Sequence, residues 1–427
     1  MSPGKDTLAQ AMDLVEAMSE DAPEVPVHVR AGEDRTGNGT WLDLGRPDGR
    51  CLHIMPGSWE VRVPTAREVL FRRTTLVSEI PEPVRPDDAL WDAGLRELAD
   101  LINVSEDQLP MLAAWLIATM RSDIPVPVLF ILGEQGTGKS TATRLMRSVT
   151  DPSPARSQSS HNNERDMSAA VRNGWIYATD NNSVMPAWLS DELCRLVTGD
   201  SKVNRALYSD DDVVVLQYRR PVIINSIDLA GLRADLADRM AAVRLSPIAD
   251  AARRSDADVE RAFAEAHPRI LGSLATLASK VLAEIPAAWE TIHYRPRMID
   301  YAVILHAIDR VTGSSGLDRY AAARESLSSD VVHSNAVAEA IIRLVRQKGG
   351  GRWEGTPQEC LDQLNLLGST SSKSWPRTTR ALGGELQRIV PEFRKLGWEV
   401  NLRWRPRDPD GRQRMKYLFV ASDAGDD

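Results

Sequence analysis

The stretch "LFILGEQGTGKSTATRLM", residues 129–146, decides the fold of this chain. With the preceding Val128, its apolar start reads "VLFIL", which is typical of a strand that is buried on both faces of a parallel sheet. The pattern G-x-x-x-x-G-K-S follows, and its glycines allow backbone N–H groups to point at phosphate oxygens. The next residues are typical of a helix, whose N-terminus carries a partial positive charge. We therefore predict a loop that binds a nucleoside triphosphate, with an ordinary surface glycine loop as the alternative.

The residues of this loop have separate expected roles. Lys139 is expected to reach the β- and γ-phosphates, and the Ser140 hydroxyl is expected to ligate Mg²⁺. The loop by itself indicates only a nucleoside triphosphate, but the guanine-reading N-K-x-D motif is absent, so ATP and Mg²⁺ are the expected cofactors. The expected nucleotide-binding residues are Gly133, Glu134, Gln135, Gly136, Thr137, Gly138, Lys139, Ser140 and Thr141.

A second buried strand, "GWIYATD", ends in Asp180, which is the candidate for holding Mg²⁺. Motor ATPases usually place a glutamate after this aspartate as the base that orients water, but Asn181 stands here. Either Asp180 does both jobs or the base comes from elsewhere, with Asp191 as a possible source. In the simpler alternative, Asp180 only caps the end of the strand.

Two further residues are expected at the same edge of the sheet. The strand "RPVIINS" brings Asn225 to a position from which it could sense the γ-phosphate. Arg239 ends a short helix just before the next strand, and in ring ATPases such an arginine enters the neighbouring subunit's site and stabilises transition-state charge. The alternative is a surface arginine that is paired with Asp235 or Asp238. Lys139, Asp180, Asn225 and Arg239 are the predicted catalytic residues.

Composition predicts a soluble, cytoplasmic protein. The net charge is −8, and the three cysteines are far apart and lack metal-ligand spacing. The N-terminus lacks the features of a signal peptide, and the longest apolar stretch, residues 111–120, is about half the length that crosses a bilayer. We therefore expect free thiols in a reducing compartment and no membrane association.

The quoted segments GEQGTGKS, ATDN, GDSKVNRALYSDDDVVVLQYRRPVIINS and DLADR, in this order, resemble the superfamily 3 helicases of the AAA+ class. The resemblance is closest to the poxvirus-type helicases of phages, prophages and actinobacterial mobile elements, and it covers about residues 95–330. It implies a hexameric ring with ATP sites between subunits and single-stranded DNA in the central channel. A primase or another replication protein is a further implied partner, although no primase domain precedes the motor here.

The resemblance also implies a DNA-contacting hairpin between Gly199 and Arg220. Its basic residues are Lys202, Arg205, Arg219 and Arg220, whereas the apparent tip at residues 210–212 is acidic and would repel phosphates. The alternative is that these basic side chains only cover solvated strand faces.

The C-terminal part is locally basic, with 16 lysines and arginines against 9 acids between Ala336 and Val420. Three helical segments precede two strands, which is the order of a winged helix-turn-helix. Arg377, Arg380, Arg405 and Arg412 are the predicted duplex-binding residues. A winged helix that binds only protein is the alternative.

Together these features predict an α/β fold: an AAA+-like P-loop NTPase core with a parallel sheet, a helical lid, a small β-rich N-terminal region and a C-terminal winged helix. The proline-rich stretch at residues 79–88 is predicted to be an extended linker. The expected segments are an α+β N-terminal region (1–85), a helical collar (86–121), the ATPase core (122–250), a helical lid (251–332) and a basic winged-helix-like domain (333–427).

The leading hypothesis for function is an ATP-dependent DNA helicase or translocase in phage, prophage or plasmid replication. The alternatives are an ATP-switched DNA-binding loader or initiator, and a regulatory or defence ATPase that does not unwind DNA.

Overall fold

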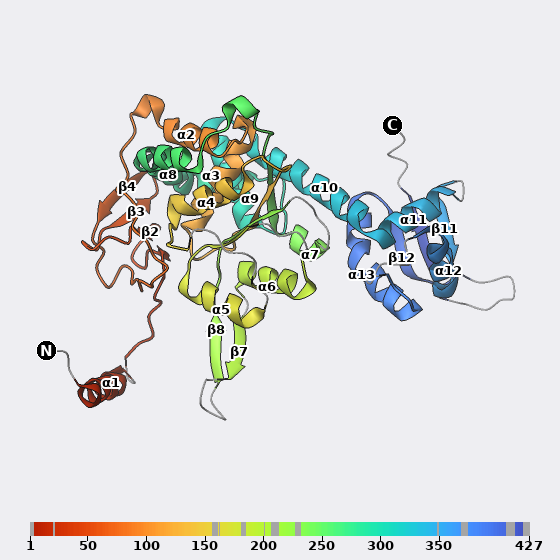
Figure 1. The fold of residues 1–427 in the computed structure, drawn as a ribbon, viewed down its shortest axis with the longest axis horizontal. Helices are drawn as coiled ribbons and strands as arrows, with labels where there is room; N and C mark the ends of the chain where they lie inside the picture. Colours follow the sequence, from red (N-terminus) through yellow and green to blue (C-terminus); the bar gives the residue numbers. More distant parts are fainter. Residues whose placement is uncertain are drawn as a thin grey trace.

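Two large hydrophobic cores organise the described part of the chain, and a small third cluster holds Trp41, Cys51 and Val69. The larger core contains buried residues from Val29 to Val331, and the smaller one contains buried residues from Val332 to Phe419. Figure 1 shows the second core as a separate body that the helix α10 (Gly316–Ser334) joins to the first. The computed structural model describes residues 4–19, 22–155, 161, 163–180, 185–199, 201–205, 213–226, 232–347, 350–368, 375–406 and 415–421.

A four-stranded parallel sheet lies in the larger core, in the strand order β10-β5-β9-β6. All its strands run in one direction, so their C-terminal ends meet at one edge. The predicted alternation of parallel strands and helices is thus confirmed. The strands are β5 (Val128–Leu132), β6 (Tyr177–Thr179), β9 (Val222–Ser226) and β10 (Met240–Arg244). The helices between them are α4 (Lys139–Thr150), α5 (Glu164–Asn173), α6 (Ala187–Thr198) and α7 (Ala234–Ala237).

The N-terminal region forms a small antiparallel sheet that is fixed to the larger core. Arg30 is fully buried, and its Nε donates to Asp151 Oδ1 at 3.0 Å. The other oxygen of Asp151 accepts from the Ile176 N–H at 2.9 Å, just before β6. One ion pair therefore ties the N-terminal sheet to the parallel sheet. The elements are α1 (Lys5–Ser19), β1 (Ala31–Glu33), β2 (Thr40–Asp43), β3 (Cys51–Met55) and β4 (Ser58–Arg62).

The stretch that was predicted to be an extended linker is packed instead. Ile80 is fully buried, and its N–H donates to the Leu44 carbonyl at 2.8 Å. The Val84 N–H donates to the Pro268 carbonyl, and Val84 lies so close to Gly272 that a Cβ there would meet the Val84 oxygen at 1.7 Å. The segment is extended, as predicted, but the buried Ile80 and these backbone hydrogen bonds attach it to the core.

Helices complete the larger core. They are α2 (Ala93–Leu101), α3 (Leu109–Thr119), α8 (Asp256–Thr291), α9 (Ile299–Thr312) and α10, with short 3-10 turns at Asp88–Leu90, Glu106–Gln108 and Asp250–Ala252. The helix α8 is long and apolar enough to cross a membrane by length and composition alone. However, 56% of its apolar window is buried inside the protein, and it packs against α2 and α9. This burial is typical of the central helix of a soluble core.

The second core has the element order helix, strand, helix, helix, strand, strand. Its elements are α11 (Ala336–Gln347), β11 (Arg352–Gly355), α12 (Pro357–Leu367), α13 (Thr379–Lys395), β12 (Glu399–Trp404) and β13 (Lys416–Val420). The sheet order is β11-β13-β12, with antiparallel pairing throughout. The predicted helices and the two final strands are present, but the four-residue strand β11 was missed because its sequence is too short to show a period.

Candidate functional site

The loop between β5 and α4 has a backbone that requires its glycines. Gly136 and Gly138 both have φ of +83°, a conformation that side chains with a Cβ rarely adopt. A Cβ on Gly133 would lie 2.5 Å from the Thr137 hydroxyl, which donates to the Glu134 carbonyl at 2.9 Å. Gly138 is the N-cap of α4 and offers no side chain to cap it, so the first-turn N–H groups are available to an anion.

Lys139 closes over this loop from the start of α4. Its Nζ donates to the Gly133 and Glu134 carbonyls, each at 2.7 Å. Partial burial lowers the pKa of Lys139 and the nearby Asp180 opposes that change. The ammonium group therefore lies on the carbonyl side of the loop, within reach of a ligand that the loop would bind.

Three predicted residues converge beside Lys139. The Ser140 hydroxyl donates to Asp180 Oδ1 at 2.9 Å, and Asn225 Nδ2 donates to the same oxygen at 2.8 Å. Asp180 directly follows β6 and Asn225 lies in β9, the neighbouring strand, so sheet topology alone brings them together. Asn225 is almost fully buried, and it also donates to the Thr143 hydroxyl at 2.8 Å. Thr143 was not predicted, although its place one helical turn after Ser140 was a usable signal.

The oxygen atoms of this cluster suit Mg²⁺. Mg²⁺ prefers oxygen ligands and usually binds through one or two carboxylates plus phosphates and water. Ser140 and Asp180 supply a hydroxyl and a carboxylate whose oxygen atoms already lie within hydrogen-bond distance. In the part of the chain that the structure describes, no group of three or more His, Cys, Asp or Glu residues could hold a metal by itself. The donor set therefore fits a metal that shares its ligands with a bound triphosphate.

A cavity of about 430 Å³ adjoins the loop. Asn103 fixes one wall, because its side chain donates to the Ser246 carbonyl while its backbone has φ of +57°. The cavity has both apolar and charged walls, and its volume is in the range of small-molecule sites. Its lining includes Leu101, Ile102, Asn103, Thr137, Gly138, Thr141, Ile248, Arg253 and Val259.

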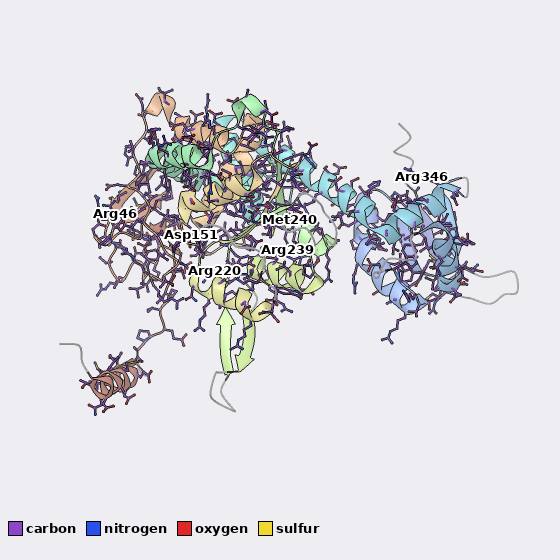
Figure 2. All side chains as sticks on the ribbon, viewed as in Figure 1. Arg46, Asp151, Arg220, Arg239, Met240 and Arg346 are labelled. Carbon is purple, nitrogen blue, oxygen red and sulfur yellow. The ribbon has the colours of Figure 1, made fainter. Side chains whose placement is uncertain are left out.

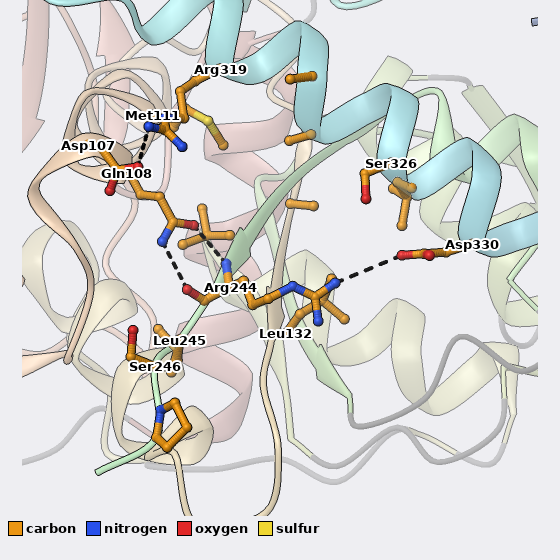
Figure 3. A pocket seen from close by; sticks show the side chains of 16 residues that line it. Asp107, Gln108, Met111, Leu132, Arg244, Leu245, Ser246, Arg319, Ser326 and Asp330 are labelled. Atoms are coloured by element: carbon orange, nitrogen blue, oxygen red, sulfur yellow. Dashed lines mark hydrogen bonds and ion pairs between the residues drawn. The ribbon is translucent and has the colours of Figure 1, made fainter. Parts of the chain in front are cut away.

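A slightly larger cavity, about 470 Å³, lies against the outer edge of β10 (Figure 3). The Gln108 side-chain amide donates to the Arg244 carbonyl at 2.9 Å and accepts from the Arg244 N–H at 2.8 Å, so it closes this edge of the strand. The charged side chains are also paired, Arg319 with Asp107 and Arg244 with Asp330. None of the predicted nucleotide-binding residues lines it. The cavity beside the loop is therefore the better candidate for a nucleotide.

The predicted arginine finger is folded into its own subunit. Arg239 is only 7% exposed, its Nη1 donates to the Asp235 carbonyl, and the same nitrogen lies 3.5 Å from Cys194 Sγ (Figure 2). The Asp235 carboxylate is 3.9 Å away, so the alternative of a pairing with Asp235 describes this conformation, although the side chain is buried rather than on the surface. Burial raises the pKa of the Cys194 thiol to about 12. In this conformation the Arg239 side chain contacts Asp235 and Cys194 and not the Lys139 cluster of the same chain.

Asp191 and the position after Asp180 are the predicted places for a catalytic base. Asp191 accepts from Arg233 Nη1 at 2.8 Å and is thus engaged in an ion pair. Asn181 lies outside the described residues.

The predicted hairpin has the expected backbone. β7 (Ser201–Arg205) pairs antiparallel with β8 (Val213–Gln217), and Figure 1 shows both strands extending away from the larger core. The side chains of Lys202 and Arg205, and residues 210–212, lie outside the described part of the structure.

Arg219 and Arg220 bond to the protein rather than extending from the hairpin. Arg220 Nε donates to the Val171 and Gly174 carbonyls, each at 3.0 Å, and burial lowers the pKa of Arg220 to about 10. Arg219 Nη1 donates to the Ser122 carbonyl at 3.4 Å. Figure 2 places Arg220 within the larger body, so the predicted DNA contact by Arg220 does not fit this structure. The reason is that the chain enters the sheet here and the guanidinium satisfies carbonyls at the end of α5.

Basic side chains of the second core are exposed. Arg377 and Arg380 lie at the start of α13, and Arg405 follows β12. Arg412 lies outside the described residues.

Comparison with known proteins gives two family matches. Residues 95–330 match the family described as actinomycete integrative conjugative element replication protein, and residues 337–424 match the C-terminal domain of the same proteins, AICE RepA. No curated protein matches the sequence.

Solved structures show only a distant likeness. The active helicase Cch of SCCmec type IV is 12% identical, with coverage of 98% of this chain and 84% of that chain, at a TM-score of 0.40. The C-terminal region of NrS-1, in its A-form apo structure, is 13% identical, with coverage of 98% and 91%, at a TM-score of 0.39. Scores this low do not establish a shared fold or activity.

Proposed function

The chain belongs to the family of actinomycete integrative conjugative element replication proteins, and on that premise we propose that it is an ATP-driven DNA helicase or translocase. The observation that carries the proposal is the convergence of Ser140 and Asn225 on one oxygen of Asp180, beside a lysine that closes a glycine loop. This arrangement fits the finer resemblance to superfamily 3 helicases of the AAA+ class.

The chain's own residues would act as follows. The loop N–H groups and the N-terminus of α4 bind the phosphates, and Lys139 exchanges its two carbonyl acceptors for phosphate oxygens. Ser140 and Asp180 hold Mg²⁺, which neutralises phosphate charge when bound. Asn225 keeps the Asp180 carboxylate oriented. Asp180 also orients the attacking water, because Asp191 is engaged by Arg233.

Assembly would complete the site. In a hexameric ring, Arg239 would leave its contacts with Asp235 and Cys194 and stabilise transition-state charge in the neighbouring subunit. The β7–β8 hairpin would track a single strand in the channel, and the exposed arginines of the second core would bind duplex DNA. Phosphate contacts of this kind depend on local charge, so the net charge of −8 does not oppose them.

The first experiment measures ATP hydrolysis with and without DNA, together with strand displacement on forked duplexes. Lys139→Ala should abolish hydrolysis, whereas Lys280→Ala should not, because Lys280 lies in α8 with its Nζ over the Trp91 ring, before α2. Hydrolysis by Lys139→Ala, or none by the wild-type protein under any condition, would reject the proposal. DNA-stimulated hydrolysis without strand displacement would reject the helicase and leave a translocase or a loader.

A mixing experiment tests the shared site. Arg239→Ala should lose hydrolysis while it retains nucleotide binding. Mixing it with Lys139→Ala should restore part of the activity, because some interfaces then combine an intact loop with an intact arginine. A mixture as inactive as both parents would reject the assignment of Arg239 as a residue acting in trans.

A further inference from the structure

The last turn of α13 touches the segment that carries Arg239. Lys395 Nζ, from the second core, forms an ion pair with the Asp238 carboxylate and also lies 2.8 Å from Glu392 Oε1. Asp238 immediately precedes Arg239 in the chain. Packing between α13 and α7 accompanies the ion pair. The second core therefore contacts the larger core one residue away from the candidate finger.

Asp238 is shared by two cations. Arg324 Nη2, from α10, donates to Asp238 Oδ1 at 2.9 Å, on the same carboxylate that pairs with Lys395. The Asp238 side chain is 23% exposed, and that of Lys395 is 37% exposed. A partly exposed ion pair of this kind is weak enough to form and break reversibly.

The polar atoms around this contact are incompletely satisfied. Glu392 Oε2, Arg239 Nε and Arg324 Nε are all buried without a hydrogen-bond partner among the described residues. Buried polar atoms normally find partners, and leaving one without a partner costs free energy. A rearrangement of the junction could give these three atoms hydrogen-bond partners.

The same helix also carries the candidate duplex-binding residues at its other end. Arg380 lies in the first turn of α13 and Lys395 in its last. A helix of 17 residues is about 25 Å long, and Pro391 lies inside it between these two ends. DNA bound near Arg380 would displace the helix or bend it at Pro391, and either change shifts the end that holds Asp238.

We propose that the Lys395–Asp238 ion pair is a latch by which the C-terminal domain keeps Arg239 in its own subunit until DNA binds. Lys395 is thus a positioning residue that acts through Asp238 on Arg239. The inference rests on the proposed function for the role of Arg239 in catalysis, but the latch itself is a physical contact that can be tested without ATP hydrolysis.

The first test measures alkylation of Cys194 by iodoacetamide, with mass spectrometry to identify the labelled cysteine. Cys194 is buried, and Arg239 Nη1 lies 3.5 Å from its sulfur, so release of the arginine should expose the thiol. Lys395→Gln should speed labelling about two- to fivefold, which is the range for losing the partly exposed ion pair with Asp238. The substitution also removes the ion pair with the buried Glu392, so Asp238→Asn is measured beside it. Labelling of the buried Cys51 and Cys360 should not change.

Two further variants and one ligand sharpen this test. Lys395→Arg keeps the charge and should label like the wild type, as should Arg343→Gln, which breaks an ion pair within α11 of the same domain. A mixed-sequence duplex oligonucleotide should speed Cys194 labelling in the wild type but add little in Lys395→Gln. Wild-type labelling rates in Lys395→Gln would overturn the proposal. If Lys395→Gln also exposes Cys360, the C-terminal fold is lost. Cys194 labelling in Asp238→Asn, which removes the ion pair through the other partner, then tests the latch.

Hydrolysis separates the latch from the proposed function. If the wild type hydrolyses ATP, Lys395→Gln should raise the DNA-free rate and reduce the DNA stimulation ratio, with unchanged nucleotide affinity. DNA affinity should rise by about the same two- to fivefold, because DNA no longer has to break the ion pair in order to bind. If Cys194 becomes exposed in Lys395→Gln but the DNA-free rate of ATP hydrolysis does not change, the proposed effect of the ion pair on Arg239 is overturned. If the wild type never hydrolyses ATP, the proposed function fails, and Cys194 labelling still shows whether the latch exists.

Discussion

Asn225→Ala tests whether the polar cluster at the sheet edge acts in catalysis. The substitution removes the Nδ2 group that donates to Asp180 Oδ1 and to Thr143 Oγ1, each at 2.8 Å. Asp180 then retains the Ser140 hydroxyl as a donor. The Asp180 carboxylate therefore loses the hydrogen bond that holds it in position from β9.

The expected size follows from the lost bond. A hydrogen bond to a charged group contributes about 1.5–3 kcal/mol. If the bond is needed only in the transition state, this corresponds to a loss in kcat of about 10- to 150-fold, at about 1.4 kcal/mol per tenfold change. ATP affinity should change little, since the loop and Lys139 supply most of the phosphate contacts.

The assay is steady-state ATP hydrolysis together with equilibrium binding of a fluorescent ATP analogue. Asn173→Ala is the matched control, because Asn173 is half-buried on α5 and its side chain, among the described residues, donates to the Ala169 carbonyl of its own helix. Circular dichroism should show both variants folded. A kcat for Asn225→Ala within twofold of the control would refute the reasoning, as would an affinity loss that accounts for the whole effect.

Three other substitutions probe stability and the loop. Arg30→Met leaves Asp151 buried without its cation and should lower the free energy of unfolding in urea by about 3–5 kcal/mol; a loss below about 1 kcal/mol would contradict a buried ion pair of this kind. Gly138→Ala should weaken the binding of an ATP analogue. Gly313→Ala, at a similar φ of +73°, should lower the free energy of unfolding without changing that affinity. Equal affinity losses in the two variants would contradict a special role for the loop. Burial lowers the pKa of His267 from 6.5 to about 4, so between these pH values the unfolded chain binds a proton that the folded chain does not. The contribution of the neutral, buried His267 to stability is therefore complete above pH 6.5 and is lost as the pH falls towards 4. Urea midpoints between pH 7 and 5 should therefore fall less steeply in His267→Phe than in the wild type, and an equal slope would contradict this.

The sequence predicted those parts of the site that depend on local pattern and strand direction. The loop is a contiguous motif, so Lys139 and Ser140 needed no knowledge of tertiary structure. Asp180 and Asn225 were predictable because each comes at the end of a buried strand, and parallel strands end at a common edge. Thr143 was missed although it lies one helical turn after Ser140, because this spacing alone does not show that the same face of α4 points toward Asn225 in β9.

Long-range packing accounts for contacts that the sequence did not show. The sequence placed Arg220 on a DNA-binding hairpin, but its partners are the Val171 and Gly174 carbonyls, some fifty residues earlier in the chain. Arg30 and Asp151 are 121 residues apart, so no local pattern could show that the N-terminal sheet is part of the larger core. Such pairs become visible only when the fold brings them together.

The backbone of Arg239 limits how the proposed latch can work. The Arg239 carbonyl accepts from the Val128 N–H at 2.8 Å, which fixes it to the start of β5, the strand that leads to the phosphate loop. Met240, the next residue, begins β10 and pairs with Val128 (Figure 2 shows Arg239 and Met240 together). Release must therefore be a rotation of the arginine side chain with a shift of α7, because moving the backbone would break the sheet beside the loop. Hydrogen exchange should accordingly leave the amides of β10 protected in Lys395→Gln while Cys194 becomes accessible. Loss of protection in β10 would mean that the sheet edge itself opens, and the latch would then act on the fold and not on the finger.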